Sequence, residues 1–177
     1  MSQGAGLVNA RRSASIPRSP EGNVAGGRRH ARQRALLMVY VDTSALVPVF
    51  IREPKSEAVI GWLESSGERL AISEWSLVEF ASAAAIKVRT GQATANLAKQ
   101  ATARVHEFAQ KHCTLAVPGR EEFHRAAELA GDGALKLRAG DALHLAIAAS
   151  LSAQGILCLD DAMIESARSL GMRVVTL

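Results

Sequence analysis

Four acidic residues stand where a charge is costly, and they carry most of the functional information in this 177-residue chain. Asp42 and Asp160 each end a short apolar run that is typical of a strand. Glu79 is the only charged side chain between residues 75 and 86, and Asp141 opens a helix-like segment. A carboxylate in such surroundings is unfavourable unless a cation meets it. We therefore expect the four acids to share one site.

The chemistry expected of such a site depends on a metal ion. Carboxylates brought together without a counter-charge raise one another's pKa, and a divalent cation removes that penalty. The ligand atoms on offer are all oxygen, with Thr43, Ser44 and water able to complete the set, so Mg²⁺ or Mn²⁺ is predicted rather than Zn²⁺. Thr43 is expected to orient a carboxylate or a water. A metal of this kind suits phosphodiester hydrolysis, because it polarises the phosphoryl oxygen and generates hydroxide.

The elements that position these acids alternate between short strands and helices. The pattern predicts strands at 39–42, 70–72, 113–117, 156–159 and 172–175. It predicts helices at 45–50, 55–65, 74–90, 93–111, 121–130, 139–153 and 162–170. Short apolar strands, each followed by a helix, indicate an α/β domain with a parallel sheet covered on both faces. Ligands bind at the carboxyl ends of the strands in such sheets, which is where Asp42 and Asp160 stand.

Residues 38–177 resemble a PIN-domain ribonuclease, and more particularly a VapC-type toxin of a bacterial toxin–antitoxin pair. The resemblance is carried by four motifs in order, VDTSAL at 41–46, SLVEF at 76–80, RAGDALHLA at 138–146, and LCLD at 157–160 with GMRVV following at 171–175. It implies a three-layer α/β/α sandwich and Mg²⁺-dependent endonuclease cleavage of RNA. It also implies a homodimer and a small antitoxin partner. The catalytic and metal-binding residues that it implies are Asp42, Glu79, Asp141 and Asp160.

Three residues near these motifs leave open questions. Cys158 stands where such sequences often carry Thr or Ser, and a thiol is a poorer hydrogen-bond donor than a hydroxyl. Asp161 offers a second carboxylate beside Asp160, and strand alternation lets only one of them face inward. Likeness of register favours Asp160. His144 is interpreted as a partly buried packing residue that an oxygen-rich site does not need.

The cations that would contact RNA phosphates are few. Arg52, Lys87 and Arg138 are the candidates, although solvated helix ends are the commoner explanation for such residues. The formal net charge is +4, but residues 1–37 contribute +6, from seven arginines against Glu21. The remainder holds 14 basic and 16 acidic residues, and its net charge of −2 does not by itself indicate nucleic-acid binding.

Two parts of the chain are expected, a disordered basic leader at 1–37 and a PIN-like domain at 38–177. The leader is rich in Gly, Ser, Pro and Arg and cannot bury enough apolar area to fold. It is either a simple tail, an arm that binds phosphates, or a stretch upstream of a native start at Met38. No apolar run approaches the roughly 20 residues of a membrane span. Two cysteines without C-x-x-C spacing are typical of a reduced, cytoplasmic compartment.

Other interpretations of the acids remain. Each aspartate could be only a helix N-cap, a position that Asp favours, although all four together argue for a site. A non-catalytic scaffold of the same fold, binding RNA or a partner protein's arginine, is the alternative function. An aspartyl-phosphate phosphotransferase also places Asp after a strand, but no second Asp lies two residues after Asp42.

Overall fold

The computed structural model describes residues 37–177, so the expected leader lies outside the described residues except for Leu37. The strands are β1 (Met38–Val41), β2 (Arg69–Ser73), β3 (Cys113–Ala116), β4 (Gly155–Leu157) and β5 (Arg173–Val174). The helices are α1 (Thr43–Phe50), α2 (Ser56–Ser65), α3 (Glu74–Arg89), α4 (Ala95–His112), α5 (Arg120–Gly131), α6 (Ala139–Ser150) and α7 (Asp161–Ser169). Each element that the sequence pattern predicts is present in the described part of the chain.

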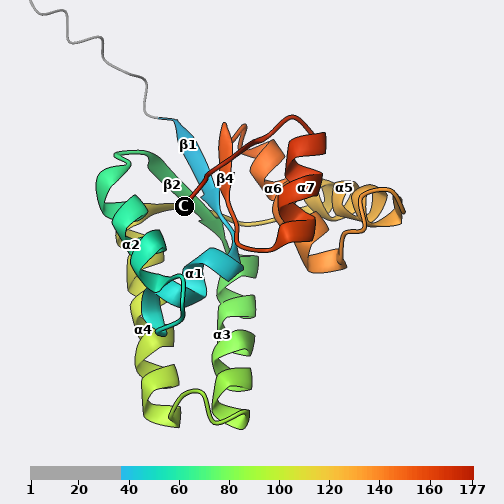
Figure 1. The fold of residues 1–177 in the computed structure, drawn as a ribbon. Helices are drawn as coiled ribbons and strands as arrows, with labels where there is room; N and C mark the ends of the chain where they lie inside the picture. Colours follow the sequence, from blue (N-terminus) through green and yellow to red (C-terminus); the bar gives the residue numbers. More distant parts are fainter. Residues whose placement is uncertain (1–36) are drawn as a thin grey trace, which may run out of the picture. The chain divides into compact units, whose positions relative to one another are not determined.

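The five strands form one sheet in the order β3-β2-β1-β4-β5, and every neighbouring pair is parallel (Figure 1). In the register of this sheet Tyr40 lies between Ala71 of β2 and Ile156 of β4. Because all strands run the same way, their carboxyl ends meet at one edge. The prediction of a parallel α/β sheet is confirmed, and β1 lies at its centre.

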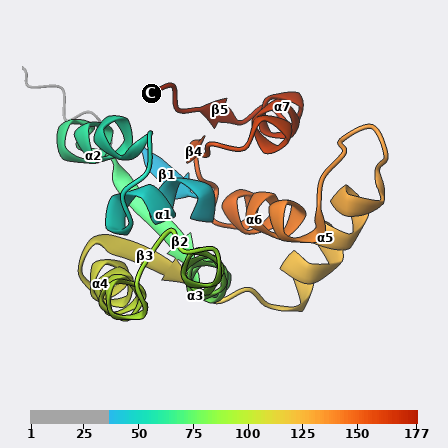
Figure 2. The same cartoon turned by 60° about the horizontal axis from the view of Figure 1, so that its bottom comes forward.

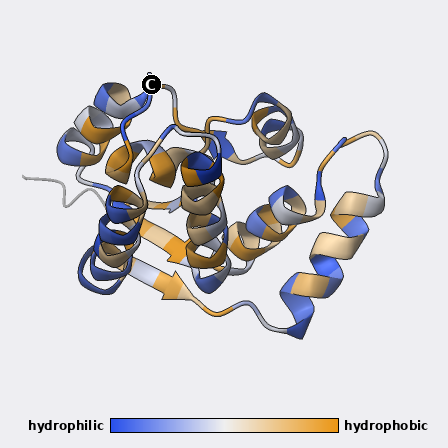
Figure 3. Ribbon diagram, turned by 90° about the horizontal axis from the view of Figure 1, so that it is seen from below, coloured by the Kyte–Doolittle hydropathy of each residue, from blue (hydrophilic) through white to orange (hydrophobic). Residues whose placement is uncertain are grey.

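Successive side chains of β1 point to opposite faces of the sheet, as strand geometry requires. Val39 and Val41 pack with apolar residues of α1, α2, α3 and α4, whereas Tyr40 packs with those of α5, α6 and α7. Figure 2 looks along α3 and α4 on their side of the sheet, with α5 and α6 on the other. Figure 3 shows strongly hydrophobic segments both on strands of the sheet and on the helices around it. The three-layer α/β/α arrangement predicted from the sequence is therefore present.

Three strands pass directly into helices at the carboxyl edge, and each junction carries a capping side chain. Asp42 caps α1 by accepting a hydrogen bond from Ser44 N, and Asp160 caps α7 by accepting one from Met163 N. Ser73 caps α3 in a reciprocal pair with Ser76. Asn, Asp, Ser and Thr are the favoured N-caps because their oxygens satisfy the free N–H groups of the first turn. The capping role that the sequence offers for Asp42 and Asp160 is thus real.

One helix is shorter than the sequence predicts. The pattern predicts a helix over 139–153, but α6 ends at Ser150. The chain then turns at Ser152, which adopts a positive φ of 52° that no helix can continue. Within residues 37–177 no helix is long and apolar enough to span a bilayer.

Candidate metal centre

Asp42 uses its two carboxylate oxygens for different purposes. Its Oδ2 accepts hydrogen bonds from Ser44 N at 2.9 Å and from the Ser44 hydroxyl at 2.5 Å, which fixes the start of α1. Its Oδ1 lies 3.2 Å from His144 Nε2. Only 4% of the residue is exposed. Capping and site chemistry therefore do not compete, because each uses one oxygen of the same rigidly held carboxylate.

Glu79 reaches the same point from the middle of α3. Its Oε2 accepts a hydrogen bond from the Thr43 hydroxyl at 2.8 Å and lies 2.5 Å from His144 Nε2. Burial raises the pKa of Glu79, but the hydrogen bonds from His144 and Thr43 and the charge of His144 outweigh it and leave the pKa below its usual value. The Thr43 hydroxyl thus donates to a carboxylate of this group.

His144 corrects the sequence analysis, which interpreted it as a packing residue outside the site. Its imidazole, on α6, is 1% exposed and contacts both acids through Nε2. Its Nδ1 lies 2.8 Å from the Tyr40 hydroxyl. Burial lowers the pKa of His144, but the hydrogen bond with Glu79 and the charges of Asp42 and Glu79 raise it above its usual value overall. Glu79 has its basic partner outside its own helix, because His144 is 65 positions away in the chain.

Asp141 and Asp160 lie at the margin of this group. The Asp141 carboxylate accepts a hydrogen bond from Arg138 N at 3.3 Å, across the first turn of α6. Burial raises the pKa of Asp141, and the charges of Asp160 and Asp42 raise it further. Among the described residues, the group whose ligand atoms all lie within 4.8 Å of one another is Asp42, Glu79 and His144. Asp141 and Asp160 are near enough to act by charge, but they are not in that tight group.

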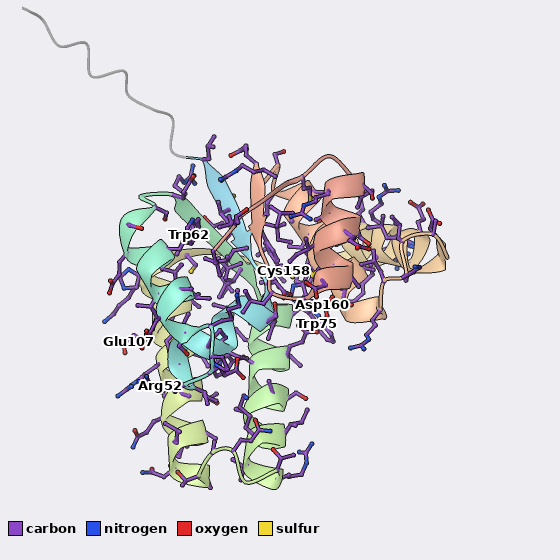
Figure 4. All side chains as sticks on the ribbon, viewed as in Figure 1. Arg52, Trp62, Trp75, Glu107, Cys158 and Asp160 are labelled. Carbon is purple, nitrogen blue, oxygen red and sulfur yellow. The ribbon has the colours of Figure 1, made fainter. Side chains whose placement is uncertain are left out.

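The two neighbouring aspartates after β4 point to different places. Asp160 is half-buried and its charge acts on Asp141. Asp161 is exposed and lines a separate hollow with Lys55 and Arg168. Of the two, Asp160 is the one whose charge acts on another site acid, and the choice of Asp160 as a site residue stays a prediction. Figure 4 labels Asp160 and Cys158 just beyond β4 and Trp75 at the start of α3.

Cys158 lies against the Asp42 carboxylate, with its Sγ 3.6 Å from Oδ2. Burial and the charge of Asp42 raise the pKa of this thiol to about 12, so it stays protonated. The stronger support comes from Ser44, whose hydroxyl donates to Asp42 and accepts from Leu159 N at 2.9 Å. Ser44 thereby joins the ends of β1 and β4, and the carboxylate is held without a hydroxyl at position 158.

Gly140 leaves room for the Glu79 carboxylate. A Cβ at this position would lie 2.6 Å from Glu79 Oε1 and 3.7 Å from Trp75 Nε1. A larger residue there would have to displace the end of the Glu79 side chain. Local sequence pattern gives no sign of this role for Gly140, because the approach of Gly140 to Glu79 is a tertiary feature.

The predicted phosphate contacts differ in their surroundings. Lys87 forms a half-buried ion pair with Glu53, and Arg52 forms an exposed one with Glu57 at 3.3 Å. Arg138 is exposed at the start of α6. Within residues 37–177 no lysine or arginine forms a salt bridge with the site acids, and His144 is the basic side chain that contacts them.

A cluster of acids with a histidine at the carboxyl edge of a parallel sheet defines the class of site, and comparison with known proteins gives the family. The PIN domain model matches residues 39–169, and the chain therefore belongs to the PIN-domain family. No curated protein sequence matches the chain significantly.

Solved structures with a similar fold include VapC20 of Mycobacterium tuberculosis, described as a sarcin–ricin loop cleaving toxin. It has a TM-score of 0.60 and 15% identity over 72% of this chain and 94% of that one. VapBC2 of Rickettsia felis, bound to a DNA fragment from its promoter, has a TM-score of 0.56 and 14% identity over 80% and 99%. A toxin–antitoxin complex from Klebsiella pneumoniae has a TM-score of 0.55 and 18% identity over 78% and 96%. At these identities the likeness establishes a shared fold.

Proposed function

We propose that this protein is a metal-dependent endoribonuclease that acts as the toxin of a toxin–antitoxin pair. The observation that carries the proposal is the convergence of Asp42 Oδ1 and Glu79 Oε2 on one buried point at the carboxyl edge of the sheet. Membership of the PIN-domain family and the fold shared with VapC toxins support the same function.

The donor set fits a divalent cation. Two carboxylate oxygens and an imidazole nitrogen come together there, and Asp141 and Asp160 add negative charge nearby. We propose Mg²⁺ as the ion, with Mn²⁺ as the alternative, because hard oxygen ligands predominate. When bound, such an ion polarises the phosphoryl oxygen and lowers the pKa of a water.

The residues of this chain divide the remaining work. Asp42 and Glu79 bind the ion, and the Thr43 hydroxyl fixes the orientation of Glu79. Asp141, half-buried beside the acids, is proposed to accept a proton from the attacking water. Asp160 adds negative charge beside Asp141 and holds the first turn of α7 in place. Arg52, Lys87 and Arg138 are proposed to contact RNA phosphates, and Arg138 is an exposed residue three positions before Asp141.

The test is cleavage of ribosomal RNA and of a sarcin–ricin hairpin by the full chain with Mg²⁺ and with EDTA. Asp42→Asn removes one charge and keeps the shape of the side chain. We expect the cleavage rate to fall at least about 100-fold, because the variant weakens binding of the ion that stabilises the transition state. Each tenfold fall in rate corresponds to about 1.36 kcal/mol of lost transition-state stabilisation. Cleavage that survives both EDTA and Asp42→Asn would refute the metal mechanism. Binding of RNA or of a partner protein without turnover would favour the non-catalytic scaffold.

The neighbouring aspartates supply a matched pair of variants. Asp160→Asn removes charge beside Asp141, whereas Asp161→Asn removes an exposed charge one residue further along. We expect the first to slow cleavage at least about tenfold and the second to leave it unchanged, because only the first alters the charge felt in the site. Equal effects of the two would show that Asp160 has no special place in the reaction.

The partners are also proposals. Solved complexes of similar fold from Rickettsia felis and Klebsiella pneumoniae contain an antitoxin, and we propose a small antitoxin for this chain. A gene that overlaps this one and encodes a short DNA-binding protein would identify it, and co-expression should then suppress RNA cleavage. We further propose a homodimer, which light scattering would detect as twice the mass of one chain. A single-chain mass at micromolar concentration would refute the dimer.

A further inference from the structure

The site contains one nitrogen ligand among its oxygens, and that ligand is held as firmly as the acids. His144 Nε2 lies 2.5 Å from Glu79 Oε2 and 3.2 Å from Asp42 Oδ1. A metal-free protein needs a cation beside two carboxylates, and a protonated imidazole serves that need. The same three atoms are also close enough to surround a metal ion, and the contacts on the far side of His144 bear on whether its Nε2 acts as a proton donor or as a metal ligand.

The far side of the imidazole is bound to a buried chain of hydroxyls. The Tyr40 hydroxyl lies 2.8 Å from His144 Nδ1 and 2.9 Å from Ser73 Oγ. Ser73 Oγ is in turn 3.0 Å from Ser76 Oγ, and all three hydroxyl-bearing residues are fully buried. When Nδ1 carries a hydrogen it can donate to the Tyr40 oxygen, and the Tyr40 hydrogen then goes to Ser73. In that neutral tautomer the Nε2 lone pair faces Asp42 and Glu79, whereas a protonated Nε2 donates to Glu79 in the metal-free protein.

Three electron-pair donors directed at one point need a cation between them. Metal-bound histidines nearly always donate their other ring N–H to a fixed acceptor, which sets the tautomer and the orientation of the ring. Tyr40 is placed to be that acceptor here. The 3.2 Å between Nε2 and Asp42 Oδ1 matches the roughly 3 Å that separates neighbouring ligands about 2.1 Å from one octahedral ion, whereas the 2.5 Å between Nε2 and Glu79 Oε2 is a hydrogen-bond distance that has to lengthen when the ion binds.

We propose that His144 Nε2 is a metal ligand together with Asp42 and Glu79, and that the Tyr40 hydroxyl orients it. This inference rests on the proposed metal-dependent function and changes its expected selectivity. Imidazole suits transition metals, whereas Mg²⁺ prefers oxygen ligands, so the site should bind Mn²⁺ more tightly than Mg²⁺. The nitrogen is also the feature that separates this site from the all-oxygen site expected from the sequence.

The direct test is the electron spin-echo modulation of Mn²⁺ bound to the full chain. We expect nitrogen modulation from one directly bound imidazole, and it should change when histidine is labelled with ¹⁵N. The chain has five histidines, so His144→Gln should abolish the modulation. His124→Gln, an exposed position on α5, is the matched control and should leave it unchanged.

Calorimetric titration with MnCl₂ and MgCl₂ gives a second readout that does not depend on activity. We expect His144→Gln to reduce the preference for Mn²⁺ about tenfold or more. Tyr40→Phe should weaken Mn²⁺ binding about 10- to 100-fold while the nitrogen modulation remains, because an orienting group is lost but the ligand is kept. Circular dichroism checks that each variant is folded.

The outcomes separate this inference from the proposed function. Mn²⁺ that binds with no histidine nitrogen in its modulation would overturn the ligand role of His144 and leave the metal-dependent function intact. No binding of either ion would refute the proposed function itself. The spin-echo measurement on the unaltered chain decides the point even if His144→Gln does not fold. Unchanged affinity in Tyr40→Phe would overturn the orienting role of Tyr40 alone.

Discussion

The two oxygens of Asp42 should be separable by mutation, because one caps a helix and the other faces the site. Asp42→Ala removes the cap of α1, which is worth about 1 kcal/mol, and the charged acceptor of the Ser44 hydroxyl, worth about 1.5–3 kcal/mol. These contributions overlap, so we expect a loss of roughly 2–4 kcal/mol in the free energy of unfolding. For a domain of this size that lowers Tm by very roughly 5–15 °C.

Asp42→Asn should behave differently in the same measurement. The amide keeps an oxygen that can accept the hydrogen bonds from Ser44, and its neutral charge removes repulsion with Asp141 while losing the attraction of His144. We expect its stability to remain within about 1 kcal/mol of the unaltered chain, because these effects oppose each other. Both variants should lose RNA cleavage to a similar extent, since both lack the charge of Oδ1.

Urea denaturation in EDTA, followed by circular dichroism, measures the stability without any contribution from bound metal. The rate of RNA cleavage with Mg²⁺ measures the activity of the site. Equal stability of the two variants would refute the assignment of Oδ2 to the cap. Retained cleavage in Asp42→Asn would refute the assignment of Oδ1 to the ion.

Three further predictions concern groups around the site. In EDTA the contacts of protonated His144 should stabilise the folded chain fully below the unfolded pKa of His144, near 6.5, and this contribution should decline as the pH rises through the higher folded pKa. The urea midpoint should therefore decrease between pH 6 and pH 9. His144→Gln should flatten this trend. Burial raises the pKa of Cys113 and of Cys158 to about 12. Both thiols should therefore react slowly with Ellman's reagent at pH 8 in the folded protein and rapidly in urea. A fast reaction without urea would contradict this prediction. Ser44→Ala should cost about 1–3 kcal/mol of unfolding free energy, because Leu159 N loses its acceptor and Asp42 a donor; a cost below about 0.5 kcal/mol would show that Ser44 does not join β1 to β4.

A network of buried polar side chains lies beneath the site. Tyr40, Ser73, Ser76 and His144 are almost fully buried, and each finds a hydrogen-bond partner within the group. A buried polar group without a partner costs about 1–3 kcal/mol, so the network is stable only as a complete set. Its residues come from β1, the end of β2, the first turn of α3, and α6. The site is therefore supported by the same contacts that fix α6 against the sheet.

Local pattern was enough to predict the elements and the place of the acids. Short apolar strands followed by helices favour a parallel sheet, and carboxyl ends in such a sheet meet at one edge whatever the details of packing. Asp42 therefore had to lie at that edge, and its capping role depends only on residues two positions away. Thr43 directly follows Asp42 in the chain, so its place beside that acid also follows from the sequence alone.

Only the tertiary structure decided what meets those acids. His144 and Glu79 are 65 residues apart, and Tyr40 and His144 are 104 apart, so no spacing in the sequence relates them. Their contact depends on how α6 packs across the sheet against α3, which is fixed by the shapes of many apolar side chains together. For the same reason the approach of Gly140 to Glu79 and the outward direction of Asp161 follow from packing and not from local pattern. The sequence by itself determined an acidic site at the edge of a parallel sheet, and the packing of α6 made it a site with a nitrogen.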